Sequence, residues 1–253
     1  MTTMDSHFPQ FPKTRPELPS DYQKIYQTEY LINRTAGGFA NRIAAWLESW
    51  MHKRIAQSGP KPLPKLLEIG AGTLNHVAHE ATFSQYDAIE PLRFLWTSTG
   101  VTPPGQVYAD LNEVPRDRRY DRIFSVAVLE HLCELPEVIA HSGLLLEKDG
   151  LFAAGIPSEG GLLWKLAWQY GTGPGFKKRT GLDYGPLMRF EHVNDAQEIE
   201  GVLRYFFSKV DRVRFPLPFL NLSFYTLLIG SQPKITLCHQ FLNQLSDSKS
   251  LSE

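Results

Sequence analysis

The feature that most constrains this chain is an alternation, from Lys65 onward, of short apolar runs with longer segments of helical character. The runs with the length and composition of strands are Leu66–Ile69, Tyr86–Ile89, Gln106–Ala109, Arg122–Val128, Leu151–Ile156, Val210–Phe215 and Leu222–Ile229. Alternating strands and helices favour a parallel sheet with helices on both faces. The last two runs lie close together in the chain, which permits an antiparallel hairpin at the edge of that sheet.

The amino-terminal part has a different texture. Residues 1–19 are rich in proline and poor in aliphatic residues, which predicts a flexible or extended leader. Apolar residues then recur at helical spacing within residues 20–58, most clearly from Phe39 to Ala56. The length of 253 residues fits one domain, which we expect over residues 20–253.

A further segment, residues 158–194, follows the fifth predicted strand. It combines helical texture with a Gly-rich and locally basic stretch from Gly171 to Gly181. Because it leaves the carboxyl end of a strand, we expect it to fold over that edge of the sheet as a lid that binds an acceptor; the alternative is a solvated surface loop. Lys177 in this stretch is a candidate for binding a phosphate or carboxylate of a substrate.

Charge and composition exclude several classes of protein. The 26 basic and 27 acidic residues give a formal net charge of -1, so the chain lacks the basic surplus typical of nucleic-acid-binding proteins. No apolar run approaches the ~18 to 20 residues that span a bilayer, and the first residues do not resemble a secretory signal. Cys133 and Cys238 are too few for a disulfide framework, and no spacing predicts a metal site. We therefore expect a cytoplasmic protein without a membrane span, a metal or a nucleic-acid partner.

A strand that runs into a Gly-x-Gly turn begins the predicted sheet. Gly70 and Gly72 follow the run that contains Glu68, and glycines let a ligand approach the backbone closely. Glu90 and Asp110 stand at the ends of the next two runs. In a parallel sheet these ends share one edge, where ligands bind and where a carboxylate can accept both hydroxyls of a ribose. The joint pattern predicts a site for a nucleotide-like cofactor.

A dinucleotide is one alternative for such a site. Its fingerprint, Gly-x-Gly-x-x-Gly, would require a glycine where this chain has Asn75. An oxidoreductase also needs proton-transfer residues, and Tyr205 and Lys209 do form a Tyr-x-x-x-Lys pattern. That pattern falls where a late helix gives way to the hairpin, which argues against a catalytic role.

The residues that form this site resemble the class I S-adenosylmethionine-dependent methyltransferases. The resemblance rests on Glu68-Ile-Gly-Ala-Gly72, on Glu90 and Asp110, and on the fourth-strand phrase from Tyr120 to Leu132, which ends Leu-Glu-His-Leu. It implies an α/β, Rossmann-like sheet of seven strands, mostly parallel, with an antiparallel last strand, preceded by helices over residues 20–58. One departure is Leu74, where the family usually has glycine.

The resemblance also assigns residues to S-adenosylmethionine. These are Glu68, Gly70 and Gly72 around the methionine part, Glu90 at the ribose hydroxyls, Asp110 and Leu111 at the adenine, and Ser125 and Val126 beneath the sulfonium. An acidic edge suits a cofactor that carries a sulfonium and an ammonium group. No metal is required, because the positive sulfur already activates the methyl group.

The acceptor site is predicted from histidines and their neighbours, because a hydroxyl acceptor must lose its proton to a base. His131, after the fourth strand, and His192, in the insertion, are the two candidate bases. Arg189 and Glu191 beside His192 are candidate substrate-binding residues, as is Lys177; His131 could instead have a structural role. His76, close to the glycine turn, is a further candidate base.

The patterns and the resemblance together predict a methyltransferase that acts on a small molecule or glycan, at oxygen, with nitrogen and carbon as alternative acceptor atoms. The phrases Ile156–Gly161 and Arg189–His192 are similar to those of methyltransferases of cell-envelope polysaccharide synthesis. The alternatives are an NAD(P)-dependent oxidoreductase and a non-catalytic regulator that binds S-adenosylmethionine.

Overall fold

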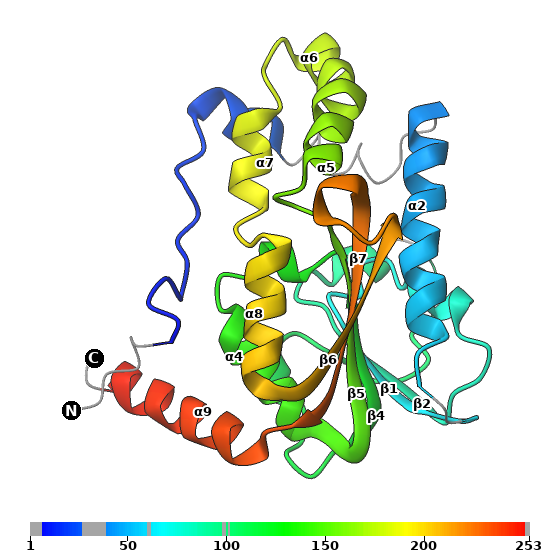
Figure 1. Ribbon diagram of the computed structural model, residues 1–253, viewed down its shortest axis with the longest axis vertical. Coiled ribbons are helices and arrows are strands. Elements are labelled where there is room, and N and C mark those ends of the chain that lie inside the picture. The colour runs from blue at the N-terminus through cyan, green and yellow to red at the C-terminus, as the bar shows by residue number, and fades with distance from the viewer. Residues whose placement is uncertain (1–6, 27–38, 60–61, 98–99, 101, 251–253) are drawn as a thin grey trace.

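The computed structural model describes residues 7–26, 39–59, 62–97, 100 and 102–250. Its centre is one seven-stranded sheet (Figure 1). The strands are β1 (Lys65–Ile69), β2 (Gln85–Ile89), β3 (Val107–Tyr108), β4 (Tyr120–Val126), β5 (Leu146–Pro157), β6 (Phe207–Pro216) and β7 (Ser223–Pro233). Their order across the sheet is β3-β2-β1-β4-β5-β7-β6, and β7 runs antiparallel to both of its neighbours while the other pairs are parallel. The predicted fold class is confirmed.

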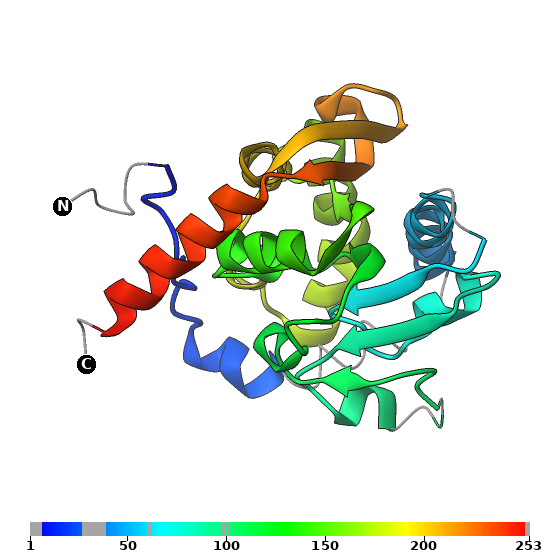
Figure 2. The ribbon, with the colours of Figure 1, turned by 90° about the horizontal axis from the view of Figure 1, so that it is seen from below.

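Helices cover both faces of this sheet (Figures 1 and 2). The longer ones are α2 (Phe39–Ala56), α4 (Leu135–Leu145), α8 (Ala196–Phe206) and α9 (Ile235–Ser250). Alternate strand residues face opposite sides, so Leu67 lies in the core beneath α4 and α8, whereas Leu66 packs against Ile55 of α2. The helix expected from Phe39 to Ala56 has those bounds, whereas α9 was not predicted.

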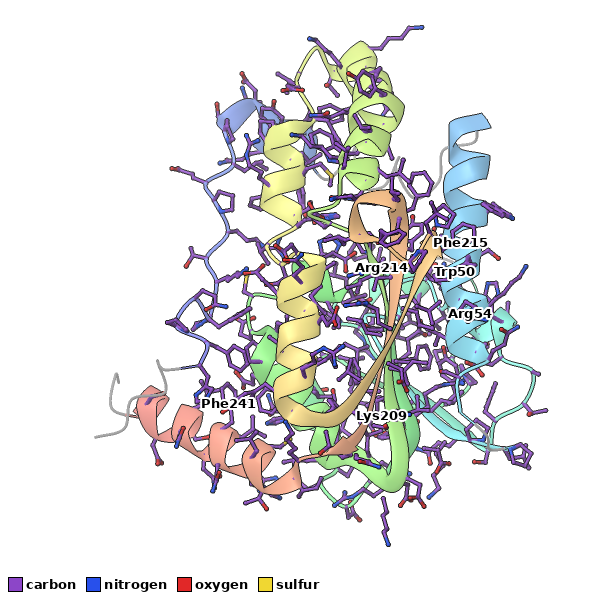
Figure 3. All side chains as sticks on the ribbon, viewed as in Figure 1. Trp50, Arg54, Lys209, Arg214, Phe215 and Phe241 are labelled. Atoms are coloured by element: carbon purple, nitrogen blue, oxygen red, sulfur yellow. The ribbon has the colours of Figure 1, made fainter. Side chains whose placement is uncertain are left out.

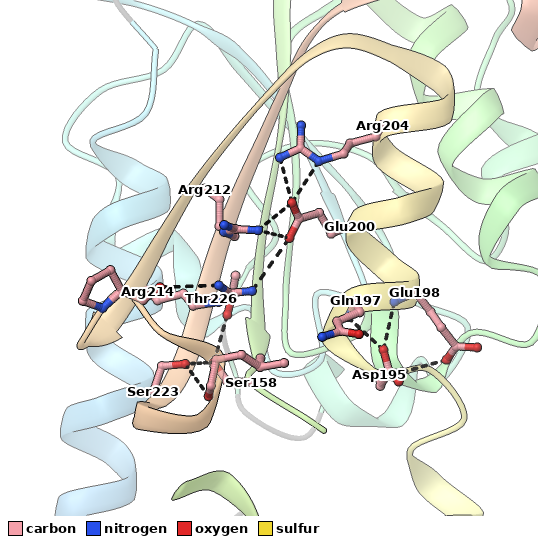
Figure 4. Close-up of polar contacts among 12 residues, drawn as sticks. Ser158, Asp195, Gln197, Glu198, Glu200, Arg204, Arg212, Arg214, Ser223 and Thr226 are labelled. Atoms are coloured by element: carbon pink, nitrogen blue, oxygen red, sulfur yellow. Dashed lines mark hydrogen bonds and ion pairs between the residues drawn. The ribbon is translucent and has the colours of Figure 1, made fainter. Parts of the chain in front are cut away.

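Helix α8 is held at its first turn and at its middle. Its first turn has a capping box in which Asp195 accepts from the backbone of Glu198, while the Glu198 side chain accepts from the Asp195 amide (Figure 4). Further along, Glu200 accepts from Arg204 of the same helix and from Arg212 of β6. These ion pairs tie α8 to the edge strand and so hold one wall beside the sheet.

The insertion after β5 rises above the carboxyl ends of the strands as a helical layer (Figure 1). It contains α5 (Leu162–Ala167), a π-helical turn η5 (Trp168–Thr172), α6 (Gly173–Thr180) and α7 (Gly185–Glu191). The short elements around the edge are η2 (Asn75–His79), α3 (Phe94–Thr97), η3 (Leu111–Glu113), η4 (Leu129–His131) and η6 (Leu220–Leu222). None of the helices that the structure describes combines the length and hydropathy needed to cross a bilayer.

The amino-terminal segment, described from residue 7, runs in extended form along α8 and α7 up to a helical stretch over residues 20–26 (Figure 1). Phe8 packs edge-on against Tyr205, and the Lys13 ammonium donates to Glu198 at 2.7 Å. The prolines do keep residues 7–19 out of helices and strands. The segment nevertheless makes specific contacts with the domain, which its composition did not indicate.

Candidate active site

A cavity of about 970 Å³ opens at the carboxyl ends of the central strands. Residues that follow β1, β2, β3 and β4 form its floor, among them Gly70, Glu90, Asp110, Leu111, Ala127 and Val128. Its walls come from η4, α4, the end of α7 and the amino-terminal segment. Segments distant in sequence therefore meet at the edge where a parallel α/β sheet binds its ligands.

The glycine turn adopts a shape that other residues would resist. Gly70 has φ +70°, and a Cβ atom placed on it would lie 2.5 Å from a methyl of Val128. Gly72 also has a positive φ, +54°, and its amide donates to Oε2 of Glu90 at 2.7 Å. Because the Leu92 amide donates to the other oxygen of Glu90 at 2.9 Å, that carboxylate is held between two loops.

Asp110 stands at the next strand end, as the sequence predicted. It caps η3 by accepting from the Asn112 amide at 2.8 Å, and it remains exposed at the edge of the cavity. Leu111 beside it is buried and lines the same cavity. The structure thus brings Gly70, Glu90, Asp110 and Leu111 together.

The other residues assigned to the cofactor lie off the cavity wall. Glu68 faces the α2 side of the sheet, where the Tyr86 hydroxyl donates to it at 2.5 Å. Burial, reinforced by the charges of Glu80 and Glu90, raises the pKa of Glu68 to about 8, although the Tyr86 hydrogen bond opposes the shift. Ser125 is fully buried in β4, and the residues described offer its hydroxyl no hydrogen-bond partner.

Two further assignments, Val126 at the end of β4 and Gly72 after β1, also lie outside the cavity lining. Val126 is half-buried and is absent from the cavity wall, to which the following residues Ala127 and Val128 contribute instead. Gly72 likewise does not line the cavity but shapes it through Glu90.

The two candidate bases are neighbours. The rings of His131 and His192 meet edge to face with centroids 4.8 Å apart, but only His131 lines the cavity. Nδ1 of His131 lies 2.8 Å from the backbone oxygen of Glu191. A carbonyl can only accept, so this bond assigns the proton to Nδ1 and, in the neutral ring, the lone pair to Nε2.

His192 lies behind His131. Its Nδ1 is hydrogen-bonded to a carboxylate oxygen of Glu159, and its ring stacks near Trp164. Burial lowers the pKa of His192, but the Glu159 hydrogen bond and the nearby charges of Glu159, Glu130 and Glu191 outweigh it and raise the pKa above the usual value.

Glu130 completes this cluster from η4. Burial raises its pKa to about 7, against the opposing charge of His192. One of its carboxylate oxygens, Oε2, finds no hydrogen-bond partner among the residues described. Proton-binding groups with shifted pKa values therefore gather behind the cavity wall, as they do at many active sites.

Of the predicted substrate-binding residues, Glu191 lines the cavity, while Arg189 and Lys177 are exposed and lie outside it. Among the lysine and arginine side chains that the structure describes, Arg15 from the amino-terminal segment lines the cavity. Its guanidinium donates to the backbone oxygens of Phe190 at 2.6 Å and His131 at 2.7 Å, and lies over the Phe190 ring. Nothing in its sequence neighbourhood indicated this position.

Three other wall residues were also missed. Glu134, Glu137 and His141 lie at the start and along α4 and line the cavity. Their spacing of three and four residues places them on one face of that helix, which is a signal that the sequence did contain.

The remaining candidates lie elsewhere. Tyr205 lies on α8 and packs against Phe8 of the amino-terminal segment. Lys209 forms an ion pair with Asp211 in β6, far from the carboxyl ends of the parallel strands (Figure 3). Tyr205 and Lys209 therefore form no catalytic pair at the cavity. His76 is fully buried, with its ring nitrogens bonded to His52 and Glu80 at 2.8 Å, and it does not reach the cavity.

Comparison with known proteins bears on the fold. No protein-family model matches the chain, and neither does any curated protein. The chain is similar in structure to a SAM-dependent methyltransferase from Thermotoga maritima, which is described as a possible histamine N-methyltransferase. The sequence identity is 13% and the TM-score 0.53, and the alignment covers 80% of this chain and 98% of the other. A second similar structure is the N-methyltransferase NodS from Bradyrhizobium japonicum in complex with S-adenosyl-L-homocysteine. The sequence identity is 14% and the TM-score 0.53, and the alignment covers 85% of this chain and 100% of the other. The chain therefore has the fold of SAM-dependent methyltransferases.

Proposed function

We propose that this protein is an S-adenosylmethionine-dependent methyltransferase whose cofactor binds in the cavity at the carboxyl ends of the strands. The observation that carries the proposal is the convergence of Gly70, Glu90 and Asp110, from three neighbouring strand ends, on one cavity. Its volume, about 970 Å³, lies at the upper end of the usual ligand pockets, which leaves room for a cofactor and an acceptor.

The chemistry of Glu90 fits the ribose of this cofactor. An ionised carboxylate offers about four acceptor positions. The amides of Gly72 and Leu92 use two of them and fix the side chain, so two remain for ribose hydroxyls. Asp110 at the neighbouring strand end supplies acceptors for an adenine amino group.

A dinucleotide fits less well. Pyrophosphate binding uses backbone amides of the glycine turn and the amino terminus of a following helix. Here the Gly72 amide is directed at Glu90, and the turn leads into η2, a 3-10 helix of five residues. Together with Asn75 in place of the third glycine, this argues against NAD.

The bound cofactor would supply an electrophilic methyl group. His131 would take the proton of a hydroxyl acceptor at Nε2, because its Nδ1 proton is held by the Glu191 carbonyl. His192 and Glu159 would position that ring from behind. Arg15 and the insertion over residues 158–194 would close the site and exclude water, which favours transfer to the acceptor.

The proposed acceptor is a hydroxyl group of a small molecule or glycan, and cell-envelope polysaccharide synthesis is the proposed pathway. One contact supports a joint role for the two phrases that resemble methyltransferases of polysaccharide synthesis, Ile156–Gly161 and Arg189–His192. Glu159, from the phrase at the end of β5, is hydrogen-bonded to His192, from the phrase at the end of α7, beside the cavity. The acceptor would therefore be recognised by residues of the insertion.

Calorimetry and turnover together test the proposal. We expect S-adenosylmethionine and S-adenosylhomocysteine to bind and NAD to give no heat. A panel of sugars, phosphorylated sugars and phenols should then reveal methyl transfer, and transfer to any acceptor excludes a purely regulatory protein. Heat from NAD, with none from either sulfur nucleoside, would overturn the assignment.

A further inference from the structure

A group of exposed apolar side chains lies at the same end of the molecule as the carboxyl ends of the strands. We call it the apolar patch, and it consists of Trp46, Leu162, Leu166, Tyr170, Leu217 and Phe219. Tyr170 is 78% exposed, Phe219 63% and Trp46 60%. Exposure of this kind in neighbouring large apolar residues marks an interaction surface more often than chance.

The patch is drawn from neighbouring elements of the fold. Leu162, Leu166 and Tyr170 follow one another at intervals of four residues along α5 and η5. The Leu162 amide donates to Asn221 at 3.3 Å, so α5 adjoins the turn between β6 and β7 that carries Phe219. On the other side of that turn, the centroid of the Phe215 ring lies 5.1 Å from that of Trp50 in α2 (Figure 3). It also lies 5.6 Å from the ring centroid of Trp46 in the same helix.

Positive charge is concentrated in the chain segment that carries part of the patch. Residues 160–182, which include α5 and α6, contain Lys165, Lys177, Lys178 and Arg179 and no acidic residue. These four basic residues are exposed, and the segment carries a formal charge of +4 in a chain whose net charge is -1. Apolar and basic groups are thus concentrated on the same segment.

We propose that this face docks the protein on the surface of an anionic lipid bilayer. Peripheral proteins bind there through apolar and aromatic side chains that enter the headgroup boundary and through basic side chains that face anionic lipids. The patch supplies the first, with Tyr170 and Trp46 as interfacial aromatics, and residues 160–182 supply the second.

A second copy of the chain fits this face less well. In a two-fold dimer the same patch would meet itself. Both segments of charge +4 would then lie against each other, and like charges placed opposite each other oppose association. An anionic lipid surface instead complements this charge.

Docking in this way would place the cavity close to the bilayer. The patch lies where β5 and β6 end and β7 begins, and the cavity opens at the carboxyl ends of β1, β2 and β4. All of these strands belong to the one sheet drawn in Figure 1. The inference goes beyond the proposed function and does not depend on it, because it concerns where the protein resides rather than what it transfers.

Vesicle flotation tests the proposal with the full chain. We expect the protein to float with vesicles of phosphatidylcholine plus phosphatidylglycerol, to float poorly with phosphatidylcholine alone, and to lose binding as salt is raised. Equal binding to both vesicles, or binding to neither, would overturn the proposal.

Two pairs of substitutions separate the contribution of the basic side chains to vesicle binding from that of the apolar side chains. Lys165→Gln with Lys178→Gln should weaken binding to the anionic vesicles about 25-fold, since each charge near the surface contributes about fivefold. Leu166→Asp with Phe219→Asp should weaken it at least about tenfold, because charged groups do not enter the apolar layer. The matched controls are Lys148→Gln and Ile235→Asp, at exposed positions outside the patch, which should bind as wild type.

Sedimentation supplies the competing outcome. If the wild-type protein is a dimer that Phe219→Asp dissociates, the patch is an interface between copies and the lipid proposal is wrong. Should the aspartate pair fail to fold, as judged by thermal melting, the lysine pair still decides, because both of its positions are exposed.

Discussion

The backbone amide of Gly72 donates a hydrogen bond of 2.7 Å to Oε2 of Glu90. This bond joins the loop after β1 to the loop after β2, and the Leu92 amide holds the second oxygen of the same carboxylate. The side chain that the ribose would contact is therefore also the one that shapes the glycine turn. A change at Glu90 is expected to act on binding both directly and through the turn.

Glu90→Ala should reduce the affinity for S-adenosylmethionine at least tenfold. Each hydrogen bond to a charged group contributes about 1.5–3 kcal/mol, and two to the ribose would be lost. Calorimetric titration of the variant measures the effect. Asp149→Ala, at an exposed position at the other end of the sheet, is the control and should bind as wild type. Wild-type affinity in Glu90→Ala would remove this residue from the site.

Replacing the two histidines should have different effects. His131→Ala should slow methyl transfer by about 10²–10⁴-fold at saturating cofactor, because it would remove the proposed base at the cavity wall. His192→Ala removes the ring behind it and should slow transfer less, with a shift in the pH profile. Single-turnover rates and cofactor affinities measured together distinguish the two roles. Wild-type rates in both variants would mean that neither histidine moves the proton.

Arg15→Ala should lower the free energy of unfolding by about 1–3 kcal/mol, since the guanidinium then no longer donates to the carbonyls of His131 and Phe190. Denaturant titration measures the change. The matched control is Lys24→Ala, whose ion pair with Asp21 is fully at the surface and should contribute at most about 1 kcal/mol. Equal stabilities of the two variants would show that the amino-terminal segment does not hold the cavity wall.

The buried Glu68 carboxyl predicts a specific pH dependence. Its pKa is raised to about 8 in the folded protein from 4.5, so the folded state keeps a proton that the unfolded state releases between these values. The stability that it contributes is present below about pH 4.5 and is lost as the pH rises through 8. Glu68→Gln keeps an acceptor for Tyr86 and removes this titration.

The melting temperature of the wild type should therefore fall relative to that of Glu68→Gln as the pH rises from 5 to 8. Both are measured without cofactor, and Glu17→Gln, at an exposed carboxylate, is the control. Parallel curves over this range would contradict the assigned titration.

Leu74 shows what a local pattern could not predict about the fold. The family that the chain resembles usually has glycine at this position, and the backbone does adopt the left-handed conformation there, with φ +61°. That conformation costs a non-glycine residue roughly 1–2 kcal/mol. However, Leu74 is buried against Ala71 and Ala88, and burying a leucine side chain contributes about 1.5–3 kcal/mol. Tertiary packing thus offsets the local strain, and the turn forms without the third glycine.

The strand-end residues of the candidate site could be predicted from the sequence, whereas some residues of its walls could not. Glu90 and Asp110 could be placed because strand ends in a parallel sheet share one edge, so the order of motifs in the chain determines their arrangement. Arg15 could not, because it reaches the site through contacts to residues more than a hundred positions away. Similarly, whether His131 or His192 faces the cavity depends on how α7 packs, which the spacing of residues does not determine.

The position of β7 between β5 and β6 has a consequence for how such a protein can diversify. The chain must leave β5, pass over the sheet and return to the far edge strand, so residues 158–206 form a long connection whose two ends are fixed by the sheet. The entropy of closing a connection grows only with the logarithm of its length, and a doubling costs about 0.6 kcal/mol. Helices in this segment can therefore be lengthened, shortened or exchanged during evolution while the strand register that positions Glu90 and Asp110 is preserved. If the insertion binds the acceptor and the strand ends bind the cofactor, as we propose, the two kinds of recognition can evolve separately.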